Sequence, residues 1–271
     1  MSLYRAKPED GLAWVTGATK GIGRALTFAL ARQGYTVVVT ARGEDELAEL
    51  VAAAPGKVLP FACDVTDERG MRRAVAQIEK TAGPIALAVL NAGIYLPTRG
   101  DRLETSNFEK TFEVNLLGAL YGLVPASEYM AHRGRGQIML VGSASAQFGW
   151  PSAAAYGSSK AALNNLAEAL KFDFDKMNLR LQIVNPGFVD TPLTQRAPFQ
   201  KPMQISAEDC AARIVKAIER GGFETSFPRR FSFGMKTLRL LPQPLRYALM
   251  NRLTGWKDRE LAAPRKPRSG D

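Results

Sequence analysis

Short apolar runs alternate with longer amphipathic stretches over roughly the first 190 residues of the chain. The short runs are rich in β-branched side chains, which is typical of strands, whereas the longer stretches repeat their apolar positions at helical spacing. We expect strands at residues 12–16, 36–40, 58–62, 85–90, 137–141 and 181–184, and helices near residues 22–33, 44–54, 67–81, 107–131, 153–176 and 207–220. This order predicts repeated βαβ units around a parallel sheet.

The predicted strands are apolar without interruption, as in VVV at 37–39 and ALAVL at 86–90. Such runs indicate strands that are buried on both faces, because helices cover both sides of a parallel sheet. The predicted fold class is therefore α/β, a Rossmann-type doubly wound parallel sheet in three layers that forms a single domain with a helical C-terminal extension. We place this domain at residues 1–228, with a last short strand near 224–227, and the extension at residues 229–271.

A glycine-rich turn follows the first predicted strand and opens the first predicted helix, and it reads TGATKGIG at residues 16–23. The backbone amides and the dipole at such a helix N-terminus attract a pyrophosphate group, so the context favours a dinucleotide site. A tight turn that binds no ligand is the alternative. In open α/β sheets ligands bind beyond the carboxyl ends of the strands, which makes the residues after each strand the candidates for the rest of the site.

Tyr156 and Lys160 stand four residues apart in a predicted helix and therefore share one of its faces. A phenol with a pKa of about 10 is a poor acid or base at neutral pH, but a neighbouring cation favours the phenolate and lowers that pKa. This spacing is common by chance. The position of Ser143, at the end of the fifth predicted strand and 13 residues before Tyr156, argues against chance here.

The TGxxxGxG turn, the YxxxK pair and the serine before it resemble the short-chain dehydrogenase/reductase family, and the resemblance spans about residues 10–225. It implies an oxidoreductase that transfers a hydride between a nicotinamide dinucleotide and a C=O or CH–OH group. The catalytic residues that it implies are Ser143, Tyr156, Lys160 and Asn115. Relatives are commonly dimers or tetramers, so a homo-oligomer is expected as well.

Each catalytic residue takes its expected role from the family. The tyrosine exchanges a proton with the substrate oxygen, the serine holds that oxygen, the lysine contacts the nicotinamide ribose, and the asparagine holds a water that relays protons to the lysine. Ser145 stays open as an alternative to Ser143, because it lies only two residues on. A helix-packing amide without a catalytic role is the alternative for Asn115.

The resemblance also implies a cofactor-binding set that follows the strand ends. Its members are Gly17, Thr19, Lys20, Gly21, Ile22, Gly23, Arg42, Asp64, Val65, Asn91, Ala92, Gly93, Tyr156, Lys160, Pro186, Gly187, Val189 and Thr191. In the family an acid at the end of the second strand selects NAD, whereas this chain has Arg42 there and Lys20 before the second glycine. Two cations suit the dianionic 2′-phosphate, so we expect NADP(H), with NAD(H) less favoured. Two solvated surface cations are the alternative.

The residues expected around the substrate are largely apolar. They are Ser143, Tyr95, Gln147, Phe148, Trp150 and Phe188, with Phe199 nearby in sequence. An apolar pocket favours a hydrophobic ketone, aldehyde or alcohol over a sugar. The leading hypothesis is NADPH-dependent reduction of such a carbonyl, or the reverse reaction. An NAD-linked alcohol dehydrogenase and a dinucleotide-sensing protein without catalysis are the two alternatives.

The formal net charge of +10 is concentrated at the C-terminus, where residues 229–271 hold 11 Lys and Arg against three Asp and Glu. The rest of the chain is nearly neutral, and no nucleic-acid-binding motif accompanies the basic tail, so we expect no nucleic acid partner. Within the tail, Leu245, Leu249, Leu253 and Trp256 repeat at helical spacing beside arginines. That pattern is typical of a helix at a membrane surface. The favoured expectation, however, is that this face covers the chain's own pocket or a neighbouring subunit, and contact with a membrane surface is the alternative.

The remaining features of the sequence bear on the location of the protein, on metal binding and on its C-terminal end. The chain has no run of about 18 uncharged apolar residues and no apolar segment of a secretory signal at its start, so we expect a cytoplasmic protein, with peripheral membrane contact through the tail left open. Cys63 and Cys210 match no metal-ligand spacing, so no metal is expected. The composition of the residues after Leu261 predicts a disordered end.

Overall fold

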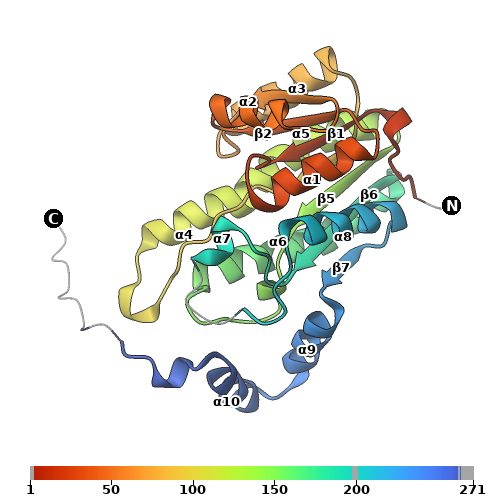
Figure 1. The fold of residues 1–271 in the computed structure, drawn as a ribbon. Coiled ribbons are helices and arrows are strands. Elements are labelled where there is room, and N and C mark those ends of the chain that lie inside the picture. Colours follow the sequence, from red (N-terminus) through yellow and green to blue (C-terminus); the bar gives the residue numbers. More distant parts are fainter. Residues whose placement is uncertain (1–2, 197–200, 262, 264–271) are drawn as a thin grey trace.

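The computed structural model describes residues 3–196, 201–261 and 263, and a seven-stranded parallel sheet lies at its centre (Figure 1). The strands are β1 (Leu12–Thr16), β2 (Val37–Ala41), β3 (Val58–Ala62), β4 (Ile85–Leu90), β5 (Gly136–Val141), β6 (Leu179–Pro186) and β7 (Glu224–Phe227). They are ordered β3-β2-β1-β4-β5-β6-β7, and each pairing is parallel. The order reverses between β1 and β4, which is the switch point where open sheets of this kind bind ligands.

Helices cover both faces of the sheet (Figure 1). The helices α1 (Gly21–Arg32), α2 (Glu44–Ala52) and α8 (Ala207–Arg220) pack on one face, and α3 (Glu68–Thr81), α5 (Gly118–His132) and α6 (Ala154–Lys176) pack on the other. Because successive strand side chains point to opposite faces, Ala13 and Val15 enter the core under α1, whereas Leu12 and Trp14 enter the core under α3 and α5. The predicted fold class, a three-layer Rossmann-type α/β sheet, is confirmed.

The segment predicted as one helix at residues 107–131 has three parts. It begins as α4 (Thr105–Phe112), passes through a π-helical turn (Glu113–Leu117), and continues as α5. The π turn contains Asn115, which is fully buried. A π turn adds one residue to the helix repeat and is frequently found at functional sites, which makes this interruption relevant to the site described below.

The C-terminal extension forms two further helices, α9 (Arg229–Leu240) and α10 (Gln243–Thr254), which lie at the outer edge of the molecule beyond β7 (Figure 1). The apolar face predicted for the second helix does not form a buried contact surface, because Leu245 and Leu253 are 55% and 62% exposed while Met250 is buried. None of the described helices is long and apolar enough to cross a membrane. The end predicted to be disordered, after Leu261, lies almost wholly outside the described residues.

Candidate active site

A cavity of about 520 Å³ opens at the carboxyl ends of the central strands. It extends from the glycine turn and Arg42 at one end to Tyr156 and Lys160 at the other. All the residues of the expected cofactor-binding set line it, although they come from segments between residues 17 and 191. The fold therefore brings the whole set to one continuous, elongated space.

The glycine turn is closely packed and leaves its backbone facing this cavity. A Cβ atom on Gly17, whose φ is +64°, would lie 2.7 Å from the Cα atom of Ala92, and one on Gly23 would lie 2.2 Å from the Gly17 carbonyl oxygen. Asn91 fixes the turn from β4, because its side-chain amide donates to the carbonyls of Thr16 and Gly17 at 3.0 and 3.1 Å. Side chains cannot enter this turn, and α1 starts at its end, so the residues present fit the pyrophosphate of a dinucleotide.

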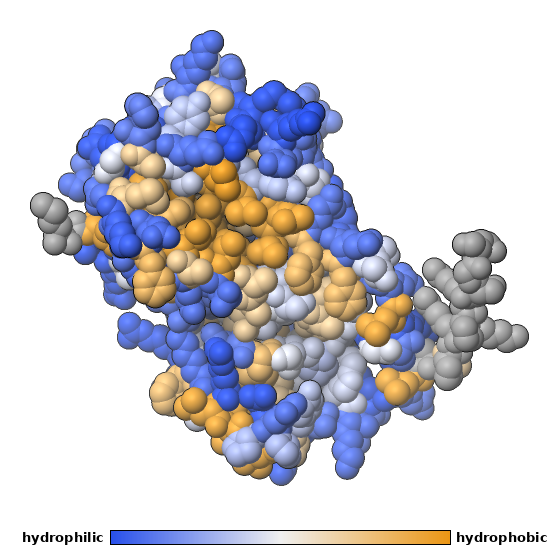
Figure 2. Space-filling view, turned by 180° about the vertical axis from the view of Figure 1, so that it is seen from behind, coloured by the Kyte–Doolittle hydropathy of each residue, from blue (hydrophilic) through white to orange (hydrophobic). Residues whose placement is uncertain are grey.

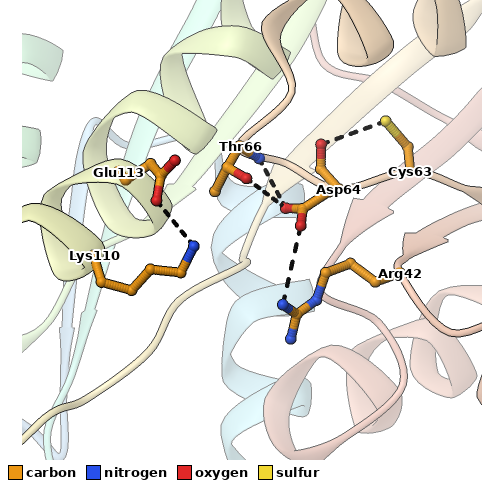
Figure 3. A network of polar contacts seen from close by, with 6 residues as sticks. All are labelled: Arg42, Cys63, Asp64, Thr66, Lys110 and Glu113. Atoms are coloured by element: carbon orange, nitrogen blue, oxygen red, sulfur yellow. Dashed lines mark hydrogen bonds and ion pairs between the residues drawn. The ribbon is translucent and has the colours of Figure 1, made fainter.

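Charged residues lie at the same end of the cavity as the glycine turn, beyond the ends of β2 and β3 (Figure 3). Arg42 and Asp64 form a long ion pair, with 4.0 Å between the guanidinium nitrogen and the carboxylate oxygen. Burial raises the pKa of the Asp64 carboxyl, but hydrogen bonds from Thr66 and the charges of Arg42 and Lys110 outweigh burial and hold that pKa below its usual value. Asp64 is therefore ionised at neutral pH.

Glu46 is a residue of this region that sequence reasoning missed. Its carboxylate accepts a hydrogen bond from the ammonium of Lys20 at 2.6 Å, and this bond holds the pKa of Glu46 below its usual value. Glu46 also lines the cavity. It lies in the acidic first turn of α2, and acids there are expected from the helix dipole alone, so the sequence offered no signal that this one reaches Lys20.

Lys160 occupies the opposite end of the cavity and is only 3% exposed. Its ammonium donates to the carbonyl of Val141 at 2.7 Å and lies 6.0 Å from the centre of the Tyr156 ring. Burial lowers the pKa of Lys160 to about 8. Burial also raises the pKa of the Tyr156 phenol, and a hydrogen bond with Ser143 counteracts part of that rise.

The two candidate serines lie side by side, and the geometry separates them. Ser143 lies beside Tyr156 and lines the large cavity, whereas Ser145 lines only a smaller cavity next to it. The hydroxyl of Ser145 donates to the hydroxyl of Ser143 at 3.0 Å, and the backbone amide of Ser143 donates to Asn185 at 2.9 Å. Ser143, rather than Ser145, therefore lies against both cavities and beside Tyr156.

Asn115, in the π turn, connects two parts of the site. Its side-chain amide donates to the carbonyl of Ile94 and to the hydroxyl of Ser159, both at 3.1 Å, and its oxygen accepts from the backbone amide of Ile94 at 2.8 Å. Ser159 in turn donates to the carbonyl of Tyr156 at 2.8 Å. Asn115 therefore ties the loop after β4 to the helix that carries Tyr156 and Lys160.

The smaller cavity, of about 80 Å³, adjoins Tyr156 and is bounded by aromatic rings. Of the residues expected around the substrate, Ser143, Tyr95, Trp150 and Phe188 line it. The Tyr95 ring meets the Tyr156 ring edge-on at 5.4 Å between centroids, and the Trp150 ring meets the Phe188 ring edge-on at 5.9 Å.

The structure places other expected substrate residues elsewhere. Gln147 and Phe148 line neither of the two cavities, and Phe199 lies outside the described residues. Phe148 stacks on Trp150 with 6.0 Å between ring centroids, so it packs against a side chain that lines the smaller cavity.

Phe231 was not expected here, yet it lines the smaller cavity and packs on Phe188 at 5.6 Å between centroids. It belongs to α9 in the C-terminal extension, where the sequence drew attention to the later Leu repeat instead.

Comparison with known proteins places the chain in a family, because the family model for short chain dehydrogenases matches residues 12–201. The chain belongs to this family. It is an oxidoreductase of the kind that acts on C=O or CH–OH groups of small molecules. The chain is 33% identical over 244 residues to an uncharacterized oxidoreductase of Myxococcus xanthus, and the match covers 89% of this chain and 96% of that protein.

Two further matches are ketoreductases. The chain is 34% identical over 181 residues to the 3-oxoacyl-[acyl-carrier-protein] reductase MabA of Mycobacterium tuberculosis, covering 67% of this chain and 70% of that one. Among solved structures, a variant of actinorhodin polyketide ketoreductase with NADPH superposes with a TM-score of 0.74, at 24% identity and over 82% of this chain and 97% of that one. The last likeness supports the fold alone.

Proposed function

We propose that this short-chain dehydrogenase reduces a hydrophobic ketone or aldehyde with NADPH, and oxidises the corresponding alcohol in the reverse direction. The observation that carries the proposal is the meeting of two spaces at Tyr156. A long cavity with a glycine turn and two cations ends there, and a small aromatic cavity begins there. A polar cofactor and an apolar substrate can therefore meet at one phenol.

In the proposed reaction the cofactor would supply the hydride and the protein would supply the proton. The bound dinucleotide would provide the hydride that reaches the carbonyl carbon. Tyr156 would give its phenolic proton to the carbonyl oxygen, and the hydroxyl of Ser143 would hold that oxygen in place. The positive charge of Lys160 would stabilise the phenolate that remains, because opposite charges in a poorly solvated site attract each other strongly.

Similarity to MabA supports a carbonyl substrate, because that relative is named as a reductase of 3-oxoacyl groups. The aromatic lining of the small cavity, with Trp150, Phe188 and Phe231, supports an apolar substituent next to the carbonyl. Arg42 and Lys20, with no acid at the end of β2, support NADP(H) over NAD(H).

A screen of hydrophobic ketones with NADPH tests the proposal, with wild type compared with Tyr156→Phe. We expect turnover of at least one ketone by wild type, a loss of at least about 100-fold in Tyr156→Phe, and unchanged NADPH binding, because only the proton donor is removed. Tyr129→Phe is the matched control, since Tyr129 lies on the outer side of α5 and is 38% exposed. Wild-type turnover by Tyr156→Phe would contradict the mechanism.

Two other outcomes would favour the alternatives. Equal or better use of NADH would identify an NAD-linked alcohol dehydrogenase. NADPH binding without Tyr156-dependent turnover of any ketone or alcohol would favour a dinucleotide-sensing protein.

We further propose that the enzyme is a homodimer or homotetramer, as members of the family commonly are. The face that carries α3, α5 and α6 has apolar side chains gathered near its middle (Figure 2). On that side Leu117, Tyr129 and Phe172 are exposed. Analytical ultracentrifugation tests this proposal, and a monomer at micromolar concentration would contradict it.

A further inference from the structure

The helix α9 has two faces with different surroundings. Its inner face holds Ser232 and Met235, which are 8% and 3% exposed, and Phe231 on this side lines the small aromatic cavity. Phe233 and Leu240, which are seven residues apart and so share one side of the helix, are 74% and 85% exposed. The helix therefore contacts the substrate cavity on one side and presents large apolar side chains to solvent on the other.

The outer side of the extension is also strongly basic. Residues 225–257 contain seven Lys and Arg and no Asp or Glu. Lys236 is paired with Glu224 at 2.9 Å, but Arg229, Arg230 and Arg239 form no ion pair with any acid of the described residues. In α10, Leu245, Tyr247 and Leu253 add further exposed apolar surface, between 55% and 62% exposed. Exposed apolar side chains beside unpaired cations are typical of helices that lie on a membrane surface.

We propose that the outer face of α9, defined by Phe233, Leu240 and the neighbouring Arg229 and Arg230, docks on an anionic membrane surface. Phosphate groups of anionic lipids would neutralise the arginines, and the two apolar side chains would enter the boundary between headgroups and acyl chains. A second copy of the chain is a poorer partner, because a two-fold contact through this face would place its unpaired cations against the same cations.

The proposed docking surface and the small aromatic cavity both involve α9, so docking bears on which substrates can reach the cavity. Phe231 and Phe233 are two residues apart, so they point to nearly opposite sides of α9. Docking through Phe233 would bring the aromatic cavity within one helix diameter of the lipid surface. This part of the inference rests on the proposed function, and it identifies the substrate class as a long-chain, lipid-like carbonyl that partitions into the membrane.

Sedimentation of the full-length chain with lipid vesicles tests the docking, in the absence of cofactor and substrate. We expect binding to vesicles of phosphatidylcholine mixed with phosphatidylglycerol, little binding to phosphatidylcholine alone, and loss of binding at high salt. Phe233→Ser combined with Leu240→Ser should weaken binding at least about tenfold, because both side chains leave water on docking. Met177→Ser is the control, since Met177 is 39% exposed just after α6 and belongs neither to the extension nor to the residues named for the subunit contact.

A pair of charge variants tests the electrostatic part. Arg229→Glu combined with Arg230→Glu should abolish vesicle binding, whereas Arg32→Glu combined with Arg69→Glu, on α1 and α3, should leave it unchanged. Equal binding to charged and neutral vesicles, or wild-type binding by the double serine variant, would overturn the proposal. A serine variant that dissociates an oligomer, in a chain that binds no vesicles, would overturn it too and assign the face to a second copy.

The substrate class has a separate readout. The double serine variant should lose rate on a long-chain ketone embedded in anionic vesicles and keep the wild-type rate on a short ketone dissolved in water. Equal rates of variant and wild type on the embedded ketone would overturn the lipid-like substrate. Because vesicle binding is measured without turnover, its failure leaves the reductase proposal standing, and a failed ketone screen leaves the docking result standing.

Discussion

Lys20 and Glu46 form an ion pair of 2.6 Å at the end of the cavity where Arg42 also lies. Lys20 precedes the second glycine of the turn, and Glu46 reaches it from the first turn of α2. Both side chains are well exposed, at 67% and 46%, so the pair can open at little cost. A 2′-phosphate bound by Lys20 would have to displace the carboxylate of Glu46 and tolerate its negative charge.

Glu46→Gln should therefore tighten the binding of NADPH by a factor of about three and leave the binding of NADH unchanged. The substitution removes a competing anion, and NADH has no 2′-phosphate to benefit from the change. Titration of both cofactors by nicotinamide fluorescence measures the two dissociation constants. Glu44→Gln, in the same helical turn, is the control. Weaker NADH binding by Glu46→Gln would instead indicate that Glu46 holds the ribose hydroxyls.

The lowered pKa of Lys160 predicts how the reaction depends on pH. Burial lowers this pKa to about 8, so the ammonium of the free enzyme loses its charge as the pH rises through that value. Reduction needs the charge to stabilise the phenolate of Tyr156, so kcat/KM for the ketone should fall above pH about 8. The measurement is kcat/KM between about pH 6 and pH 10.

Lys160→Arg is the matched variant for this profile, because the guanidinium stays charged over the whole range. It should lower the rate and remove the fall above pH about 8. A fall of the same shape in wild type and Lys160→Arg would show that another group titrates.

Burial of the Lys160 ammonium should also lower the free energy of unfolding at neutral pH. An ammonium that is poorly solvated in the folded state destabilises that state below pH about 8, and the penalty disappears as the pH approaches the unfolded pKa of about 10.4. Lys160→Met should therefore raise the free energy of unfolding by about 2 kcal/mol at pH 7, after allowance for the lost hydrogen bond to Val141.

Urea unfolding at about pH 7 and pH 10 measures this difference, which should shrink at the higher pH because wild type gains stability there. Lys216→Met, at an exposed position of α8, should show no such pH dependence. A variant that is less stable than wild type by the same amount at both pH values would show that the hydrogen bond outweighs burial of the charge.

The position of Phe231 predicts that shortening its side chain changes which sizes of ketone the enzyme accepts. Its ring lies against Gly187, where an added Cβ would come within 3.0 Å of it, and it closes one side of the small cavity. Phe231→Ala should raise kcat/KM for bulky ketones relative to small ones, because it removes this wall. The measurement is the ratio of kcat/KM for a bulky and a small ketone.

Phe233→Ala is the matched control for that ratio, since it removes the same side chain from the opposite side of α9. We expect it to keep the wild-type ratio. If both variants keep it, Phe231 does not limit the size of the substrate.

The positions of the strands and of the site residues next to them could be predicted from sequence, because both depend on local patterns. Uninterrupted apolar runs identify strands buried on both faces, and a parallel sheet brings the residues at their carboxyl ends to one edge. For that reason the glycine turn, Arg42, Ser143 and Lys160 could be assigned to one site from the strand pattern and the motifs alone.

Other features depend on contacts between segments that are distant in the sequence, which local patterns do not encode. The interruption of the long helix at Asn115 reflects its bonds to Ile94 and Ser159, and the latter is 44 residues away. The pairing of Glu46 with Lys20 depends on how α2 packs beside the glycine turn. The sequence alone determined the sheet, the glycine turn and the spacing of Tyr156 and Lys160, whereas only the tertiary structure decided that Glu46 pairs with Lys20 and that Phe231 lines the small aromatic cavity.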